Sequence, residues 1–375
     1  MIIITFLHLY IIYGFIIVFT CLSVSVAQFL QSEKVLHTLG IICASLALYV
    51  PIFLKYHCSY TEFADALVSI FSAVTGFLFT LKIVELIFTY PWSVQKQITF
   101  KQILIDFSTF PQYKYEVEPR SIKSNSISPT LLTYFNYLIL GRDEHRLSPR
   151  EKNLLIIIRG LSQLLCLRFL LHSTPYAVLR LHSQNSQFFS IIHFFIYALY
   201  GFIFYFALGM VINLVFGFMG FVWNVPIRSV YPGYPFLPLG LHDFWSRRWN
   251  IYIKAILHRI AFIALPKLTG VKDKSNARII SAGVFAFFVS GLLHEFMYTV
   301  SMDRWSGGKY MLFFLIHGLL VGLELTLEGL FKRKPLFPVV IRWMYTILAL
   351  YSTSHLFCDP WIEVDCFATL KTYLG

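Results

Sequence analysis

FFSIIHFFIYALYGFIFYFALGMVINLVFGFMGFV, residues 188–222, contains no aspartate, glutamate, lysine or arginine. Such a segment is typical of a membrane-spanning helix, because about 20 helical residues cross the roughly 30 Å hydrocarbon core of a bilayer. A helix also satisfies its backbone hydrogen bonds within one segment, where the membrane offers no water. The segment is too long for one upright helix, so we expect strong tilting or a break near Gly201 or Gly209.

The rest of the chain has the same character. Hydrophobic residues make up 57% and charged residues only 13%, with a mean hydropathy of +0.67, whereas charged residues approach a quarter in soluble domains. Long continuous apolar runs exclude the short alternating segments of a strand barrel. We therefore expect an all-α, multi-pass membrane helix bundle, forming a single integral membrane domain over residues 1–375. Eight predicted spans cover about 2–25, 35–54, 63–88, 153–171, 188–222, 277–300, 310–330 and 337–357.

Basic residues gather in three connections between these spans, at about 89–151, 223–276 and 332–334. The positive-inside rule places all three in the cytoplasm, with 89–151 as a basic cytoplasmic connection and both termini on the far side. We attribute the formal net charge of +12 mainly to basic residues that mark the cytoplasmic connections. These residues would also attract anionic headgroups or an anionic cytosolic substrate, and we do not take the charge as a sign of nucleic-acid binding.

Several function classes lack their sequence signals. The six cysteines have no paired spacing, which favours neither a disulfide framework nor a metal site. The chain has no G-x-x-x-x-G-K-S/T loop for nucleotide phosphates and no G-x-S-x-G serine nucleophile. Polar groups inside the membrane are consequently the best guide to function. Charged groups there cost on the order of 3 kcal/mol, so those that occur usually face the bundle interior or a water-filled cavity.

SGLLHEFMYTV, residues 290–300, places a histidine well inside a predicted span. Ser290, His294 and Tyr298 follow one another at helical spacing and share one face. Neutral imidazole is the cheapest ionisable group to bury and is a general base suited to neutral pH. His294 is either such a base or a hydrogen-bonded structural residue, and the sequence of this span leaves both alternatives open.

Other polar groups in the predicted spans have structural explanations. Glu295 points about 100° away from His294 around the helix, so we expect it to make a structural hydrogen bond or ion pair. Lys82 and Glu85, three residues apart near a helix end, are expected to pair or to reach towards the interface. Gly291 and Gly283 allow another backbone or a ligand to approach closely.

LHDFWSRRWNIYIKAILHRI, residues 241–260, follows a proline-rich connector and predicts an amphipathic or re-entrant cytoplasmic helix. Its polar residues share one predicted face: Asp243, Ser246, Arg247, Asn250, Lys254 and His258. A helix lying in the membrane interface explains this face, with tryptophans at headgroup depth. It does not explain the adjacent Arg247 and Arg248 beside Asn250, because paired arginines are better suited to binding phosphate groups.

Three motifs now carry a family resemblance: PLGLHDFWSRRWN at 238–250, FFVSGLLHE at 287–295 and FFLIHGLLVGLE at 313–324. In this order and spacing they resemble the plant wax synthase branch of the membrane-bound O-acyltransferase (MBOAT) superfamily. The resemblance covers about 226–330. Ser246 departs from it, since the plant members usually carry glycine at this position.

The resemblance implies an acyl-CoA-dependent O-acyltransferase that esterifies a lipidic alcohol, as wax ester synthases do. His294 would be the general base, and Asn250 would position or polarise the thioester. The residues implied in binding acyl-CoA are Trp245, Arg247, Arg248 and Trp249. Supporting candidates are Asp243, Ser290, Tyr298, His317 and Glu324, of which the last two lie seven residues apart on one helix face. Acyl-CoA would be a co-substrate, with no metal or other cofactor, and the endoplasmic reticulum is the expected membrane.

Two other classes of function stay open. An MBOAT-derived bundle could serve as a non-enzymatic structural or lipid-binding subunit of a larger membrane assembly, or as an oligomer, since fold does not fix function. The presence of both His294 and Asn250 favours the enzyme. A transporter is the third interpretation, but no inverted repeat is visible in the sequence.

Overall fold

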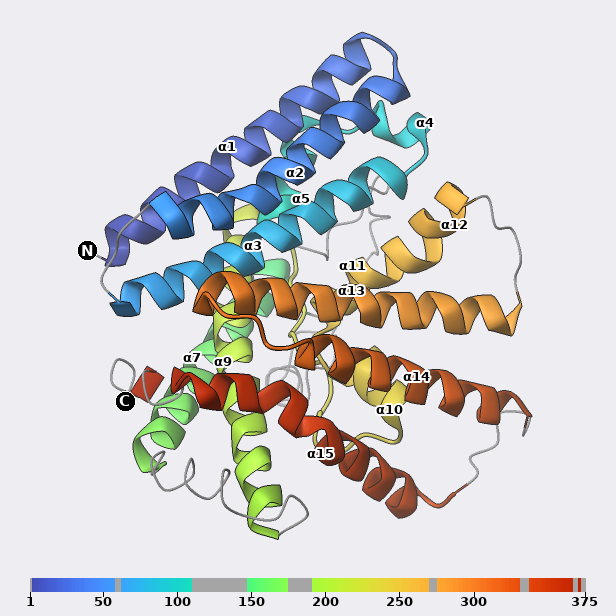
Figure 1. The fold of residues 1–375 in the computed structure, drawn as a ribbon. Coiled ribbons are helices and arrows are strands. Elements are labelled where there is room, and N and C mark those ends of the chain that lie inside the picture. Colours follow the sequence, from blue (N-terminus) through green and yellow to red (C-terminus); the bar gives the residue numbers. More distant parts are fainter. Residues whose placement is uncertain are drawn as a thin grey trace. The chain divides into compact units, whose positions relative to one another are not determined.

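The computed structural model describes residues 2–57, 62–109, 147–174, 191–269, 275–330, 337–366 and 370–371. Every regular element within these ranges is helical (Figure 1). The predicted all-α class is therefore confirmed. Residues 110–146 of the predicted basic connection lie outside the described residues.

The chain divides into two compact units, each described by itself. Unit 1 comprises Met1–Val117 and Tyr252–Thr326, and unit 2 comprises Glu118–Ile251 and Leu327–Gly375. The division after Ile251 falls within the predicted amphipathic segment. The expectation of one integral membrane domain over 1–375 stays a prediction.

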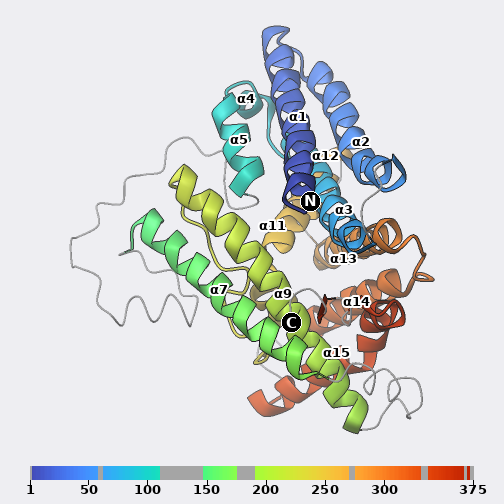
Figure 2. The same ribbon diagram turned by 90° about the vertical axis from the view of Figure 1, so that its left-hand side faces the viewer.

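Unit 1 is built around three long N-terminal helices, α1 (Ile2–Phe29), α2 (Glu33–His57) and α3 (Glu62–Phe88). Helix α2 packs on α1 and α3, and α13 (Asn276–Met302) packs on α3 (Figures 1 and 2). The described residues of this unit also form α4 (Trp92–Gln95), α5 (Phe100–Thr109), nearly all of α11 (Ile251–Arg259), the π-helical segment Ile260–Ala264, α12 (Leu265–Thr269) and most of α14 (Lys309–Leu330).

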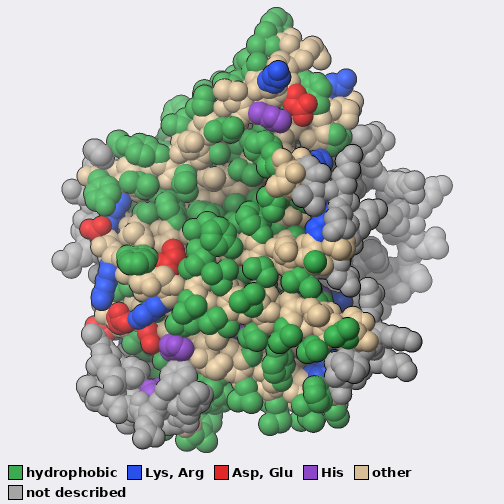
Figure 3. All heavy atoms as spheres, turned by 45° about the vertical axis from the view of Figure 1, so that its right-hand side comes forward, with side chains coloured by type: hydrophobic (Ala, Val, Ile, Leu, Met, Phe, Trp, Pro, Cys, Tyr) green, Lys and Arg blue, Asp and Glu red, His purple; other side chains and the backbone are tan. Residues whose placement is uncertain are grey.

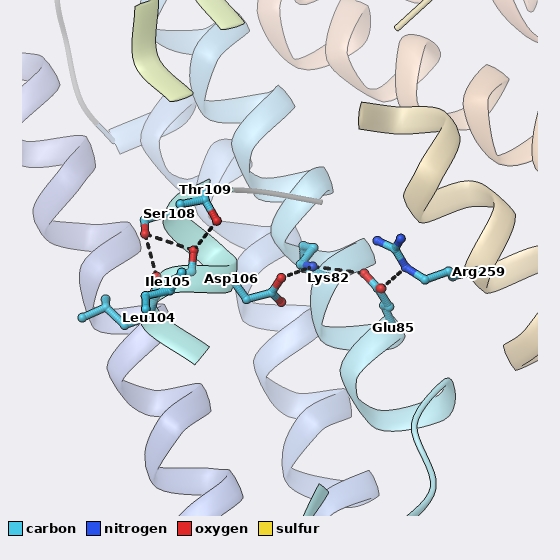
Figure 4. Close-up of polar contacts among 8 residues, drawn as sticks. All are labelled: Lys82, Glu85, Leu104, Ile105, Asp106, Ser108, Thr109 and Arg259. Carbon is cyan, nitrogen blue, oxygen red and sulfur yellow. Dashed lines mark hydrogen bonds and ion pairs between the residues drawn. The ribbon is translucent and has the colours of Figure 1, made fainter. Parts of the chain in front are cut away.

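A buried ionic network joins three helices of unit 1 (Figure 4). Lys82 of α3 donates to Asp106 of α5 at 2.7 Å and to Glu85 at 3.2 Å. Glu85 also accepts a hydrogen bond from Arg259 of α11. The predicted Lys82–Glu85 pair is confirmed, and since both side chains are at most 2% exposed, neither reaches for the interface. Two cations and two carboxylates leave the network without net charge.

The described residues of unit 2 include α7 (Pro149–Ser173), α9 (Ile191–Trp223), the short α10 (Leu241–Asp243), the π-helical segment Phe244–Arg248 and α15 (Val339–Glu363). Helices α7 and α9 lie side by side along their lengths (Figure 2). Glycine permits this approach, because a Cβ at Gly160 would stand only 2.8 Å from Leu214 Cγ. Helix α7 begins with a capping box, in which Ser148 N donates to Glu151 Oε2 at 2.8 Å and Glu151 N donates to Ser148 Oγ at 3.3 Å.

Helix α9 is continuous over 33 residues. At 1.5 Å per residue it is about 50 Å long, well beyond the hydrocarbon core. Neither Gly201 nor Gly209 breaks it, so tilting is the alternative that remains for this span. Its polar Asn213 is buried and donates to Gln163 of α7 at 2.8 Å.

Seven helices in the described part of the chain are long and apolar enough to cross a membrane, judged by length and composition. They are α1, α2, α3, α7, α9, α13 and α14. The eighth predicted span is also a helix, α15, but it carries Arg342, Asp359 and Glu363 and is not among the seven. Hydrophobic side chains cover much of the face seen in Figure 3, and Phe15 and Phe169 are 69% and 71% exposed. The chain is an integral, multi-pass membrane protein.

Candidate functional site

The segment after Gly240 is not the continuous amphipathic helix that the sequence predicts. Helix α10 is followed by a π-helical turn, Phe244–Arg248, and α11 starts only at Ile251. Between them Trp249 is extended, with φ −100° and ψ 125°, and Asn250 has a left-handed φ of 39°. Asparagine tolerates this conformation better than most residues. The polar face expected from Asp243 to His258 is thus divided in two.

Two backbone hydrogen bonds produce this break. The N–H of Trp249 donates to the carbonyl of Phe244 at 2.9 Å, five residues back, which closes the π turn. The N–H of Ile251 donates outside the helix, to Val230 of the preceding connector at 3.2 Å. Asn250 is therefore held between two fixed neighbours, and its backbone conformation sets where its half-buried side chain points.

The two tryptophans of this segment pack against the same phenylalanine. Trp249 stacks on Phe244 with ring centroids 5.6 Å apart and planes at 19°, while Trp245 meets Phe244 edge-on at 5.0 Å. Trp249 also lies 5.2 Å from the buried Tyr231. These contacts position both indoles in unit 2, and their role in binding acyl-CoA stays a prediction.

The two arginines differ in their surroundings. Arg248 Nε donates to Asp243 Oδ2 at 2.5 Å, and its Nη1 donates to the carbonyl of Tyr234 at 3.1 Å. Asp243 Oδ2 also accepts from the N–H of Leu239 at 2.9 Å. Asp243 thus orients Arg248, whereas Arg247 is exposed. The π turn explains the pairing, since residues five apart do not face one another on an α-helix.

Ser246, the departure from the family pattern, bonds within its own segment. Its hydroxyl donates to the carbonyl of His242 at 2.5 Å. This is the local side-chain to backbone bond that serines make inside helices.

His294 lies on α13, facing α14 in unit 1. Its Nδ1 is 2.8 Å from the carbonyl oxygen of Ser290, one turn earlier. A carbonyl oxygen only accepts hydrogen bonds, so Nδ1 carries the proton and Nε2 is the nitrogen able to take up another. The ring of Phe314 is 4.6 Å from the imidazole and that of Tyr310 is 6.1 Å away.

Tyr298 completes the predicted face of α13. It is fully buried, and its ring centroid is 5.5 Å from that of Tyr310. His294 and Tyr298 therefore both lie against α14, and the carbonyl of Ser290 bonds to His294. The catalytic role of His294 and the supporting roles of Ser290 and Tyr298 stay predictions.

Glu295 has the structural role that its position predicts. Its carboxylate accepts hydrogen bonds from the backbone N–H groups of Tyr310 at 3.1 Å and Met311 at 3.3 Å, in the first turn of α14. The Ser306 hydroxyl donates to it at 2.7 Å. A carboxylate here satisfies N–H groups that have no partner within the helix and opposes the positive end of the helix dipole.

Glycine brings α13 and α14 close together. A Cβ at Gly291 would stand 2.9 Å from Met311 Sδ, and one at Gly318 would stand 3.0 Å from Phe287 Cβ. The close approach predicted at Gly291 is confirmed. At Gly283, by contrast, no atom of the described residues lies within 4 Å of such a Cβ.

His317 and Glu324 lie further along α14. His317 is completely buried and packs 4.6 Å from the ring of Phe313, while Glu324 is half-buried. The predicted residues also divide between the units. Asn250 and the aromatic and arginine residues before it belong to unit 2, whereas His294 belongs to unit 1. The pairing of Asn250 with His294 stays a prediction.

Comparisons with known proteins cover the same motifs. Residues 229–316 match the model of the "Membrane bound O-acyl transferase family". The chain is 37% identical over 117 residues to "Probable long-chain-alcohol O-fatty-acyltransferase 7" of Arabidopsis thaliana, covering 30% of this chain and 34% of that protein. It is 31% identical over 132 residues to "Probable long-chain-alcohol O-fatty-acyltransferase 3" of the same organism, covering 34% and 38%.

A third relative has another acceptor in its name. The "Acyl-CoA--sterol O-acyltransferase 1" of Arabidopsis thaliana is 29% identical over 120 residues, covering 32% of this chain and 34% of that protein. The matches thus span about a third of the length of these curated relatives. They confirm the resemblance to the MBOAT superfamily and its wax synthase-like branch. The matched segment 229–316 contains Asn250 and His294 but ends before His317.

Proposed function

We propose that this membrane protein, whose residues 229–316 are similar to membrane bound O-acyl transferases, is an acyl-CoA-dependent O-acyltransferase that esterifies a lipidic alcohol. His294 acts as the general base and Asn250 positions or polarises the thioester. The observation that carries the proposal is the hydrogen bond from His294 Nδ1 to the Ser290 carbonyl at 2.8 Å. It leaves Nε2 as the nitrogen that accepts a proton.

The reaction follows from this tautomer. Nε2 takes the hydroxyl proton of the alcohol as its oxygen attacks the thioester carbonyl carbon. The carbonyl oxygen gains negative charge, which the Asn250 amide N–H stabilises as a hydrogen-bond donor. The C–S bond then breaks, the ester leaves, and the sulfur of coenzyme A takes the proton back from the imidazolium. Aromatic neighbours such as Phe314 exclude water, which would otherwise hydrolyse the thioester.

The segment before Asn250 supports recognition of the donor. Arg247 is exposed, and Arg248 is oriented by Asp243 at 2.5 Å. Guanidinium groups bind phosphate oxygens through parallel N–H donors, and the indole rings of Trp245 and Trp249 are aromatic surfaces suited to stacking with adenine. A long-chain alcohol is the first acceptor to test, because it appears in the names of two relatives reported above. A sterol is the second. The endoplasmic reticulum is the proposed membrane.

Purified protein in detergent tests the proposal. Incubated with palmitoyl-CoA and a panel of long-chain alcohols and sterols, it should release free coenzyme A thiol, and mass spectrometry should detect the ester. His294→Ala should lower the rate by about 10²-fold to 10⁴-fold, the usual contribution of a general base. The matched control is His37→Ala, which removes a histidine of α2 whose side chain is 34% exposed.

Two results would contradict the proposal. One is ester formation by His294→Ala at the wild-type rate. The other is the absence of any ester from wild type across the whole panel in lipid-supplemented preparations, which would favour a structural or lipid-binding subunit.

A further inference from the structure

Arg159 is a charged residue within an apolar membrane helix. It lies ten residues after Pro149, the first residue of α7, and so about 15 Å along the helix axis. The surrounding segment Pro149–Ser173 is apolar enough to span a membrane. Charged side chains at such depth are costly, and they mark functional sites when they persist.

The structure gives Arg159 only part of the hydrogen bonding that a guanidinium needs. Its Nη2 donates to the backbone carbonyl of Tyr231 at 3.3 Å. Its Nη1 is buried and has no hydrogen-bond partner among the described residues. Within the same ranges Arg159 forms no ion pair, so a full positive charge lacks an anion.

Tyr231 presents a second unsatisfied group beside this charge. Its side chain is fully buried and its hydroxyl has no hydrogen-bond partner in the described part of the chain. Burial, and secondly Tyr205, raise the pKa of Tyr231 well above its ordinary value, while the nearby Arg159 charge acts in the opposite direction. The hydroxyl is therefore protonated at neutral pH and can donate a hydrogen bond.

Tyr231 is held in place by the surrounding structure. The ring of Tyr231 stacks on Tyr205 of α9 at 4.5 Å and lies 5.2 Å from Trp249. Its backbone is fixed by Ser229, whose hydroxyl donates to the Tyr231 carbonyl at 3.2 Å. A fixed phenol and a neighbouring guanidinium thus both have unused donors, and such a pair points to a ligand because buried polar groups without partners are rare in native proteins.

We propose that Arg159 and Tyr231 bind an anionic oxygen of an amphiphilic ligand, either the carboxylate of a fatty acid or a phosphate of coenzyme A. A guanidinium N–H and a phenolic O–H both donate to such an oxygen, and its charge balances Arg159. The aromatic rings of Tyr205 and Trp249 give the site an apolar wall suited to the rest of the ligand. The coenzyme A alternative rests on the proposed acyl transfer and gives its donor a further contact, whereas a bound fatty acid would be a ligand outside that reaction.

Equilibrium binding to the purified full chain in detergent tests the site. The two probes are radiolabelled palmitate, which offers a carboxylate, and coenzyme A, which offers phosphates. Arg159→Gln removes the charge and should raise the Kd of at least one probe about tenfold or more, as expected for a charge-assisted hydrogen bond. Tyr231→Phe removes only the hydroxyl and should raise the Kd of the same probe severalfold. The probe affected identifies the ligand as a carboxylate or a phosphate.

Two controls separate binding from folding. Arg168→Gln makes the same change at an exposed position of α7 and should leave both Kd values at wild-type levels. Tyr231→Phe should unfold at the same temperature as wild type or higher without ligand, because its hydroxyl has no partner to lose. The proposal is overturned if wild type binds neither probe, or if Arg159→Gln and Tyr231→Phe bind both as tightly as wild type. Ester formation by the wild type in the assay described above distinguishes failure of this site from failure of the acyl-transfer proposal.

Discussion

The backbone N–H of Tyr310 donates to the carboxylate of Glu295 at 3.1 Å. This bond ties the first turn of α14 to α13, one residue after His294. Tyr310 and Phe314, whose rings flank the imidazole, both lie in the first two turns of α14. Glu295, the residue next to the proposed base His294, thus holds α14 in place, and α14 supplies the aromatic rings around the imidazole.

Removing this cap should destabilise the protein. Glu295→Ala leaves the N–H groups of Tyr310 and Met311 without their acceptor and should lower the free energy of unfolding by about 2 kcal/mol, the upper range for helix caps. Thermal unfolding in detergent measures the change. Glu33→Ala is the matched control, since Glu33 also lies in the first turn of a helix but is half-exposed. Equal effects of the two substitutions would argue against the capping role.

Asn250 allows its conformational and chemical roles to be separated. Its φ of 39° suits glycine as well as asparagine, so Asn250→Gly keeps the backbone and removes the amide. If the amide stabilises the developing oxyanion, this variant should lose about 10²-fold to 10³-fold in kcat, as when an oxyanion donor is removed. Initial rates of ester formation measure this loss. Near wild-type activity in Asn250→Gly, with loss only in Asn250→Ala, would assign the residue a purely conformational role.

The buried network of Lys82, Glu85, Asp106 and Arg259 should be sensitive to the loss of any one charge. Asp106→Asn removes the carboxylate that lies 2.7 Å from Lys82 and should cost about 3–5 kcal/mol, because a buried charge is left poorly compensated. Glu328→Gln breaks the more exposed Arg342–Glu328 pair, at 3.6 Å, and should cost less than about 1 kcal/mol. Chemical denaturation compares the two variants, and similar costs would mean that the network is solvated.

His258 should make stability depend on pH. Burial, followed by the charges of Lys254 and Arg259, lowers its pKa from the ordinary value of 6.5, and its ring stacks on Phe262 at 4.6 Å. The folded protein therefore favours the neutral imidazole. Its contribution is fully present above pH 6.5 and is lost as the pH falls towards the lowered pKa, because the unfolded chain takes up the proton first.

The measurement for His258 is the unfolding temperature between pH 5 and pH 8. Wild type should lose more stability on acidification than His258→Gln does, whereas His37→Gln should keep the wild-type slope. Parallel curves for wild type and His258→Gln would exclude this source of pH dependence.

The membrane helices were predictable because a long apolar run has one stable form in a bilayer, a helix. The direction of Glu295 was predictable for a similar reason, since successive helical residues point about 100° apart. Both predictions use only local geometry. They did not identify the partner of Glu295, because the first turn of α14 approaches α13 through tertiary packing at Gly291.

The break at Trp249 and Asn250 could not be predicted from periodicity. It depends on the hydrogen bond from Ile251 to Val230, twenty-one residues earlier in the chain, and helical spacing carries no information about such a contact. The same is true of Arg248, which pairs with Asp243 only because a π turn brings residues five apart together. A pattern with a period of 3.6 residues predicted an uninterrupted polar face instead.

The π-helical turn Phe244–Arg248 also determines how the segment should respond to changes in length. Such a turn accommodates one residue more than an α-helical turn. Deleting a residue inside it would restore α-helical geometry, end the alignment of Arg248 with Asp243 and turn every following side chain about the axis. Near Asn250, deletions and insertions should therefore be more damaging than most substitutions, and natural variants of this segment should differ in residue type more readily than in length.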